Sequence, residues 1–319
     1  RRGTVLARPR RPMARGRAYV GVSGWSYDSW RGPYYPPELA KSRWLDFVGE
    51  TLDSVEINGS FYSLQSPASY QKWAAAVPDG FVFAVKGSRF ISHNKKLKDA
   101  RAPLANFFAN GLLRLEEKLG PVLWQLPDGL RLAPERIAAF CDLLPRDTEE
   151  ASRLAADHDE RVAGRASYHV DRRRPLRHAF EVRDPRMLDG ALIDVLRRAG
   201  MALVVSDAGR WPLVEELTAG FVYVRLHGSP HTYASRYDEA ALDLWTERVR
   251  RWRDGGEPED ARRITGRAPP KRKSRDVYVY FDNDALAHAP RDAMGLRARL
   301  AGDRSTPRSP ATPPRRPGP

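Results

Sequence analysis

The sequence has a single cysteine, Cys141, among its 319 residues, and it has no long apolar run. One cysteine excludes an internal disulfide and a zinc site built from several cysteines. The longest apolar runs, such as 81–85 and 201–205, are five residues long, whereas a membrane-spanning helix needs about 20. No apolar stretch follows the N-terminal arginines, so no secretory signal is expected. We therefore predict a cytoplasmic protein that does not contact a membrane.

Acidic residues are scarce at both ends of the chain, and this explains most of the formal net charge of +14. Residues 1–17 carry seven arginines and no acid, and residues 297–319 carry six arginines and one aspartate. Residues 18–296 sum to only +2, and a basic cluster at 259–275 leaves the rest of them near −3. Basic segments of this kind supply nonspecific affinity for nucleic acid, so nucleic acid is one candidate partner.

Eight short runs rich in β-branched and aromatic residues alternate with helical patterns. The runs are 19–23, 54–57, 81–86, 122–125, 179–182, 202–206, 221–225 and 277–281. Between them, apolar residues recur three and four apart, as in amphipathic helices. Alternating strands and helices form parallel sheets, and eight such units favour a single α/β domain, an eight-stranded parallel (β/α)8 barrel of the TIM type. A doubly wound open sheet is the alternative, but residues 21–25 lack the third glycine of a dinucleotide-binding turn.

The domain boundaries follow from the same patterns. We predict a disordered basic tail at 1–17, the barrel at 18–300 with long insertions at about 146–177 and 255–275, and a disordered Pro/Arg-rich tail at 301–319. Charged segments without apolar periodicity cannot bury enough apolar surface to become ordered, so residues 262–275 are predicted to be a mobile loop. Met13 precedes the first predicted strand, which suggests that residues 1–12 are an upstream extension.

Every predicted strand ends in a polar group. The strand ends are Ser23, Glu56 with Asn58, Lys86, Gln125, Glu181 with Arg183, Asp207, Arg225 with His227, and Asp282 with Asn283. In TIM-type barrels activity lies at this rim, because the carboxyl ends of the strands converge there. A charge in an apolar run costs several kcal/mol unless it is paired or faces water. We therefore predict that Glu56, Lys86, Glu181 and Arg225 converge in one polar pocket about 10 Å wide.

Short motifs follow one another in a characteristic order over residues 19–297. They are 21–27 (GVSGWSY), Trp30 with 34–36 (YYP), 55–62 (VEINGSFY), 81–86 with 91–93 (ISH), 123–127 (LWQLP), 180–183 (FEVR), 222–228 (VYVRLHG) and 280–284 (YFDND). In this order the chain resembles the domain of unknown function 72 family, also called YecE-like proteins. The resemblance implies a TIM-type barrel and names no reaction. Two positions depart from the family pattern: Asp282 replaces a usual Asn, and residues 184–187 replace a usual His and Trp.

The candidate site residues are divided by chemistry. The candidate catalytic residues are Glu56, Lys86, Glu181 and His227, and the candidate substrate-binding residues are Ser23, Trp25, Tyr27, Asn58, Tyr62, Gln125, Arg183, Asp207, Arg225 and Asn283. Glu56 and Glu181 are the predicted general acid and base, since a partly dry pocket raises the pKa of a carboxyl group. Lys86 suits an anionic substrate group or, when desolvated, serves as a base or Schiff-base amine. His227 is a further proton-transfer candidate.

The remaining candidates bind rather than react. Arg183 and Arg225 offer bidentate forks for anionic oxygens, and Trp25 and Tyr62 are expected to form a wall on which sugar rings or bases stack. His93 is predicted to lie at the rim beyond the third strand.

No cofactor is predicted. Carboxylates and imidazoles such as those of Glu56, Glu181, Asp207 and His227 can bind a divalent metal. However, the neighbouring lysine and arginines bring about as much positive charge to the same rim, which favours an ion network without metal. The preferred function is therefore an enzyme of the hydrolase, lyase or isomerase type that acts by acid–base chemistry on a small anionic or sugar-like ligand. The alternative is a nucleic-acid-binding or nucleic-acid-processing protein that uses the same rim and the basic loop.

Overall fold

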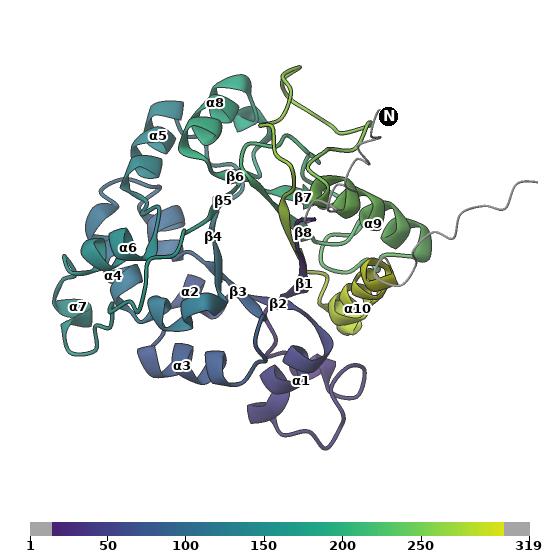
Figure 1. Cartoon of the computed structure of the whole chain (residues 1–319), viewed down its shortest axis with the longest axis horizontal. Coiled ribbons are helices and arrows are strands. Elements are labelled where there is room, and N and C mark those ends of the chain that lie inside the picture. Colours follow the sequence, from purple (N-terminus) through teal and green to yellow (C-terminus); the bar gives the residue numbers. More distant parts are fainter. Residues whose placement is uncertain (1–14, 303–319) are drawn as a thin grey trace, which may run out of the picture.

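Nine parallel strands form a nearly closed barrel surrounded by helices in the computed structural model, which describes residues 15–302 (Figure 1). The strands are β1 (Ala18–Ser23), β2 (Ser54–Ile57), β3 (Val82–Lys86), β4 (Leu119–Gln125), β5 (His178–Glu181), β6 (Ala202–Leu203), β7 (Val205–Asp207), β8 (Phe221–Leu226) and β9 (Asp276–Phe281). Their order in the sheet is β6-β5-β4-β3-β2-β1-β9-β8-β7. The predicted α/β barrel of parallel strands is thus confirmed.

Helices connect successive strands on the outside of the barrel (Figure 1). They are α1 (Trp44–Thr51), α2 (Gly59–Tyr62), α3 (Pro67–Ala75), α4 (Arg101–Ala109), α5 (Pro134–Leu143), α6 (Thr148–Ala155), α7 (Glu160–Ala163), α8 (Gly190–Ala199), α9 (Glu239–Arg253) and α10 (His288–Ala301). Short turns of 3-10 helix occur at η1 (Asp28–Trp30), η2 (Lys41–Arg43), η4 (Leu112–Lys118), η5 (Pro185–Met187) and η6 (Ala285–Ala287), and a π-helical turn at η3 (Phe90–Asn94). None of the described helices is both long and apolar enough to cross a membrane.

The predicted number of strands is too low by one, because the run at 202–206 is divided at Val204. β6 pairs with β5, and β7 pairs with β8. These two segments are the two ends of the sheet, although only one residue separates them in sequence. Within residues 202–207 the chain therefore changes its pairing partner from β5 to β8, and the barrel closes there.

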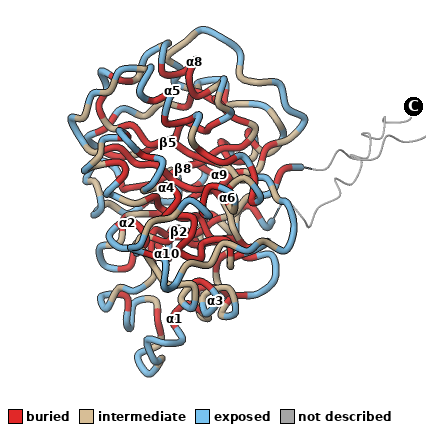
Figure 2. Tube along the Cα trace, turned by 90° about the vertical axis from the view of Figure 1, so that its left-hand side faces the viewer, coloured by how far each residue is buried: buried red, intermediate tan, exposed pale blue. Residues whose placement is uncertain are grey.

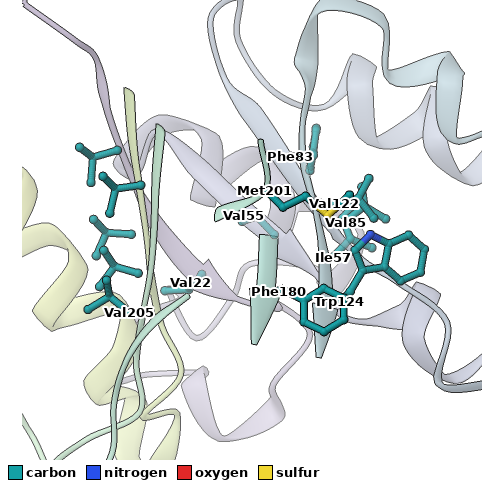
Figure 3. Packing of buried hydrophobic residues seen from close by; sticks show 14 of the residues in the cluster. Val22, Val55, Ile57, Phe83, Val85, Val122, Trp124, Phe180, Met201 and Val205 are labelled. Carbon is teal, nitrogen blue, oxygen red and sulfur yellow. The ribbon is translucent and has the colours of Figure 1, made fainter. Parts of the chain in front are cut away.

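Apolar side chains pack on both sides of the strands. The larger core lies between strands and helices, and Figure 3 shows part of it, including Val55, Val85, Trp124 and Phe180. A second cluster consists of Tyr19, Val82, Ala84, Leu123, Ala179, Ala202, Val204, Ala219, Phe221, Tyr223, Tyr278 and Tyr280. Because side chains alternate between the two faces of a strand, this second set fills the barrel interior. Figure 2 shows the resulting burial along the strands and exposure along the outer helices and loops.

The basic segment 262–275 is held at its two ends, although the sequence predicts a mobile loop. Glu216 is fully buried, and its Oε2 accepts hydrogen bonds from the backbone N–H groups of Ile264 and Thr265, both at 2.9 Å. The neighbouring Glu215 accepts from the backbone N–H of Arg262 at 3.2 Å. The prediction failed because it considered the charge of the segment and not the two carboxylates that hold it.

The far end of this segment is also held. Arg275 is 1% exposed, and its guanidinium donates to the carbonyl groups of Gly255, Gly256 and Pro270. Asp276 then begins β9, so the segment enters the barrel at the amino ends of the strands.

The predicted tails lie largely outside the described residues. Residues 1–14 and 303–319 are not described, but Gly16 and Arg17 are part of the fold. The backbone N–H of Gly16 donates to the carbonyl of Arg253 at 3.1 Å, and that of Arg17 donates to Asp276 Oδ1 at 2.9 Å. The predicted boundary of the N-terminal tail at residue 17 is therefore too late.

Glu216→Ala should release the basic segment. Arg197 Nη2 lies 2.8 Å from Glu216 Oε1, so the variant leaves this arginine unpaired. We expect the free energy of unfolding to fall by about 3–5 kcal/mol, and trypsin to cleave after Arg262, Arg263 and Arg267 faster than in the wild type. Urea unfolding and limited proteolysis measure the two effects. The control is Glu259→Ala, which removes an exposed carboxylate near the same segment. Equal cleavage of both variants would contradict the assigned role of Glu216.

Candidate functional site

Polar side chains occupy the carboxyl end of the barrel interior, next to the interior aromatic cluster. The register pairs Ser23 with Glu56, Gln125 with Glu181, and Ser206 with Arg225. Residues paired in this way lie at the same level of a parallel sheet. The register alone does not join these pairs, because Arg225 is paired with Tyr280 and Tyr280 with Gly21. The side chain of Arg225 makes the connection.

Arg225 is at the centre of this layer and is 1% exposed. Its Nε and Nη2 donate to the two carboxylate oxygens of Glu56 at 3.1 and 2.9 Å. Its Nη1 donates to Oε2 of Glu181 at 2.8 Å. Nη2 also donates to Asp282 Oδ2 at 3.1 Å and to Ser23 Oγ at 3.0 Å. One cation from β8 thus holds carboxylates from β2, β5 and the end of β9.

The carboxylate of Glu56 accepts hydrogen bonds from two further side chains. Glu56 Oε1 accepts from Ser23 Oγ at 2.6 Å, and Oε2 accepts from the hydroxyl of Tyr223 at 2.7 Å. Both oxygens of Glu56 are thereby fully engaged within the barrel.

The pKa of Glu181 is lowered, whereas the sequence analysis predicts a raised pKa. Burial alone would raise the pKa of this carboxyl group, but the guanidinium groups of Arg183 and Arg225, together with His227, hold it well below the usual range of a glutamate. The sequence prediction of a raised pKa is wrong for Glu181, because it took no account of the cations that face the group. A carboxylate held ionised in this way has no proton to donate near neutral pH, so its charge serves to hold Arg225.

His227 is fully buried between two carboxylates. Its Nε2 lies 3.2 Å from Oε1 of Glu181, and its Nδ1 lies 2.9 Å from Oδ2 of Asp282. The imidazole packs edge-on against Trp211 and Tyr233, with ring centres 5.1 and 5.5 Å apart. The sequence analysis missed both aromatic residues, which follow β7 and β8 in loops without periodicity, and position after a strand end is the signal that could have found them.

Lys86 differs from the other charges in the layer. Its side chain makes no hydrogen bond or ion pair with the described residues, and the residue is 9% exposed. The Nζ atom lies 4.5 Å from the centre of the Phe61 ring. Burial and the charge of Arg225 lower the pKa of Lys86 to about 8, against the opposing effect of Glu56, Asp282 and Glu181.

A group of cations faces the same side of the barrel mouth. The ring of His93 packs edge-on against Phe61 with ring centres 5.0 Å apart. The pKa of His93 is lowered by burial and by the charges of Lys86, Arg89 and Arg183. Lys86 at the end of β3 and His93 of η3 thus contact the same Phe61 ring, and the charges of Arg89 and Arg183 act on His93.

Arg183 connects this surface to the aromatic residues around His227. Its guanidinium carbon lies 3.8 Å from the centre of the Trp211 ring, and Nε donates to Glu181 Oε1 at 3.3 Å. Arg183 and Arg210 both approach the carboxylate of Asp128, at 3.5 and 3.2 Å.

Three other predicted residues lie with the cluster. Asn58 Nδ2 donates to Ser23 Oγ at 3.0 Å, and its buried Oδ1 has no hydrogen-bond partner among the described residues. The hydroxyl of Tyr27 donates to the backbone carbonyl of Ser23 at 2.7 Å. Gln125 is 6% exposed at the end of β4.

Four predicted site residues have other partners. Asp207 Oδ2 accepts from the hydroxyl of Tyr237 at 2.9 Å. Asn283 donates to the carbonyl of Ser235 at 2.9 Å and to Asp292 Oδ2 at 2.8 Å. Trp25 packs edge-on against Trp73 of α3, and Tyr62 is 70% exposed next to Phe61.

The donor set does not fit a divalent metal. Within residues 15–302, no group of three or more His, Cys, Asp or Glu side chains is arranged to hold a metal ion. The guanidinium of Arg225 bonds both Glu56 and Glu181, and Asp207 is engaged by Tyr237. A positive group therefore already binds the carboxylates that a metal would need.

Two hollows in the protein surface lie away from this cluster. One is lined by residues that include Leu97 and Phe140, between α4 and α5, and the other by residues that include Tyr19 and Arg297, at the amino end of the barrel. The strand-end layer meets solvent at Lys86 and Asp282, which are 9% and 14% exposed.

Comparison with known proteins gives a family and a fold. The family model described as "Protein of unknown function DUF72" matches residues 19–317. The UPF0759 protein YunF of Bacillus subtilis (strain 168) is 28% identical over 126 residues, which are 38% of this chain and 43% of that protein. The chain thus matches less than half the length of this curated relative.

Two solved structures share the barrel. A DUF72 family protein from Thermotoga maritima MSB8 has a TM-score of 0.66 at 22% identity, covering 89% of this chain and 99% of that one. A DUF72 family protein from Enterococcus faecalis V583 has a TM-score of 0.61 at 16% identity, covering 89% of this chain and 95% of that one.

Arg225→Met should destabilise the barrel by leaving buried carboxylates unpaired. We expect the free energy of unfolding near neutral pH to fall by about 3–5 kcal/mol. In the wild type, the lowered pKa values of Glu181 and Asp282 stabilise the fold above the usual carboxyl range, and this stabilisation is lost as pH falls through their folded values. In the variant, acid should instead restore stability, because protonation relieves the repulsion.

Urea unfolding between neutral and acidic pH measures both effects. The control is Arg198→Met, which removes an exposed arginine from α8. A loss no larger than that of the control, or a pH profile unchanged from the wild type, would contradict the central position of Arg225.

Proposed function

This chain belongs to the DUF72 family, and from that premise and the chemistry of the strand-end layer we propose that it is an enzyme. In this proposal the substrate is a small anionic or sugar-like molecule that binds in the barrel mouth next to Arg225. Lys86 moves a proton to or from it, as a hydrolase, lyase or isomerase requires.

The observation that carries the proposal is the unpaired state of Lys86. The carboxylates nearest to it are engaged by Arg225, Ser23 and Tyr223, so the amine is left with the face of an aromatic ring. A buried ammonium without a counter-ion lowers stability, and proteins retain such groups mainly at functional sites. With a pKa of about 8, about a tenth of the amine is neutral at pH 7, so both forms required for proton transfer are present.

The other residues have supporting roles in this proposal. Arg183 and His93 flank Lys86 and suit an anionic oxygen group. Glu56, Glu181 and His227 act as positioning residues, because they hold Arg225 in one orientation and thereby fix the charge at the base of the mouth.

The nucleic-acid alternative has weaker support. It requires the basic loop at 262–275 and the rim to act together. That loop leads into the first residue of β9, whereas the strand-end cluster lies at the opposite ends of the strands. A small substrate needs only the residues that converge at the mouth, so the enzyme is preferred.

Lys86→Met should make the protein more stable near neutral pH. The folded pKa of about 8 lies below the ordinary value of lysine, so folding is penalised while the ammonium is protonated, and the penalty disappears as pH rises between the two values. Besides burial, Arg225 lowers the pKa of this amine, and Glu56, Asp282 and Glu181 raise it. His93 lies against the same Phe61 ring as the amine. The stability difference between variant and wild type should therefore shrink above about pH 10. Urea unfolding at both pH values measures it, and a less stable variant would argue for a structural role.

Proton transfer can be tested before the substrate is identified. Small sugar phosphates, hydroxy acids and keto acids are incubated with the full-length protein in D2O, and deuterium incorporation is followed by NMR. We expect exchange in at least one compound, and a decrease of about 100-fold or more in Lys86→Met. The control, Lys95→Met, changes a lysine in the loop after the same strand and should exchange normally.

Two results would overturn the proposal. One is exchange that is unaffected by Lys86→Met. The other is the absence of exchange together with tight, salt-sensitive DNA binding that Lys86→Met weakens, which would favour the nucleic-acid alternative.

A further inference from the structure

We propose that Lys86 forms a Schiff base, so that the substrate is a small aldehyde or ketone that carries a carboxylate or phosphate group. This inference rests on the proposed function and deepens it, because it assigns a covalent step to the same amine.

The position of the amine is fixed by rigid elements. Lys86 is the last residue of β3, and its backbone carbonyl accepts a hydrogen bond from Ser60 Oγ at 2.6 Å. The backbone N–H of the next residue, Gly87, donates to the carbonyl of Leu123 in β4 at 2.8 Å. Phe61 of α2 covers the side chain. A reactive group held on a strand end in this way is positioned better than one on a free loop.

The surroundings of the amine favour a nucleophile. An amine reacts with a carbonyl group only when it is neutral, and lysines become reactive when they are desolvated or lie beside another cation. Lys86 meets both conditions, since it is 9% exposed and Arg225 is close enough to perturb it. The guanidinium keeps its charge at all relevant pH values, and it also occupies the carboxylates that would otherwise pair with Lys86.

The reaction balances without an oxidant or a reductant. The lone pair of the neutral Nζ attacks the carbonyl carbon, and the π electrons of the carbonyl move to its oxygen. A proton from nitrogen and a second proton from a neighbouring acid convert that oxygen to water, which leaves as the nitrogen lone pair forms the C=N bond. The product is an iminium ion and one water. The iminium has the same single positive charge as the lysine ammonium, so the surrounding ion network needs no rearrangement.

His93 is placed to supply and accept protons in these steps. Its ring packs against the same Phe61 that covers Lys86, and its Nδ1 lies 2.9 Å from the hydroxyl of Ser92. Burial and the neighbouring cations lower its pKa, which favours the neutral imidazole that can accept a proton.

Arg183 accounts for the anionic group of the substrate. Its Nε donates to the Glu181 carboxylate that Arg225 also binds, and its charge contributes to the lowered pKa of His93. Arg183 thus lies at the same end of the barrel as Lys86. The bidentate geometry of a guanidinium group fits both carboxylate and phosphate. The experiment must therefore distinguish a carboxylate substrate from a phosphate substrate.

The test traps the Schiff base chemically. Full-length protein is incubated near neutral pH with pyruvate or with dihydroxyacetone phosphate, then reduced with borohydride, digested and analysed by mass spectrometry. We expect one secondary-amine adduct at Lys86, formed at least tenfold faster than at Lys95, with a rate that rises as pH approaches about 8. The compound that reacts faster identifies the anion as carboxylate or phosphate.

Variants make the result specific. Lys86→Met should abolish this adduct, and Lys95→Met should leave it unchanged. Arg183→Met should slow trapping of the anionic compounds by a larger factor than trapping of neutral dihydroxyacetone. Labelling spread evenly over exposed lysines, or equal labelling in Lys86→Met, would overturn the inference.

The two proposals can fail separately. Lys86-dependent deuterium exchange without any trapped adduct would retain the acid–base enzyme and reject the Schiff base. Absence of both exchange and trapping over the same compounds would reject both.

Discussion

The buried guanidinium of Arg225 is the interaction on which the mouth of this barrel depends. From β8 it reaches Ser23 in β1, Glu56 in β2, Glu181 in β5 and Asp282 after β9. Buried charges are tolerated only when they are paired and hydrogen-bonded, and here each of the three carboxylates accepts a hydrogen bond from the same cation. Because that cation already satisfies the acids, the amine of Lys86 is left without a counter-ion. The reactivity that we assign to Lys86 is therefore a consequence of how completely Arg225 is bonded.

The polar layer rests on aromatic residues that fill the lower interior. The hydroxyl of Tyr223 donates to Glu56, and the hydroxyl of Tyr280 lies 2.8 Å from Ser54 Oγ, with the two tyrosine rings 5.1 Å apart. Tyrosine suits this place because its ring packs as an apolar group while its hydroxyl still reaches a polar partner. The charged groups thus have a rigid, hydrogen-bonded support, which limits how far their geometry can relax when a ligand approaches.

The parts of the structure that follow from periodicity could be predicted from the sequence, and the parts that depend on distant partners could not. Alternation of side chains along parallel strands places Glu56, Glu181 and Arg225 on the interior face near the strand ends, and the sequence shows that alternation directly. Asn283 lies beyond a strand end, where no alternation applies. Its side chain donates a hydrogen bond to Asp292 of α10, and the sequence does not show this contact. The lowered pKa of Glu181 depends on which cations face it, and the packing of 262–275 depends on Glu215 and Glu216, far away in sequence. The division of one strand at Val204 reflects pairing with two different neighbours, which no local pattern encodes.

That division gives the barrel a joint. β6 has two residues and β7 has three. The backbone pairing that links β5 to β8 through these two strands is therefore short. These are the strands that carry Glu181 and Arg225, whose ion pair at 2.8 Å spans the gap. Side chains thus complete a closure that the backbone makes only weakly. Loss of the ion pair between Arg225 and Glu181 would therefore loosen the ring of strands first at this joint, where the backbone contributes least.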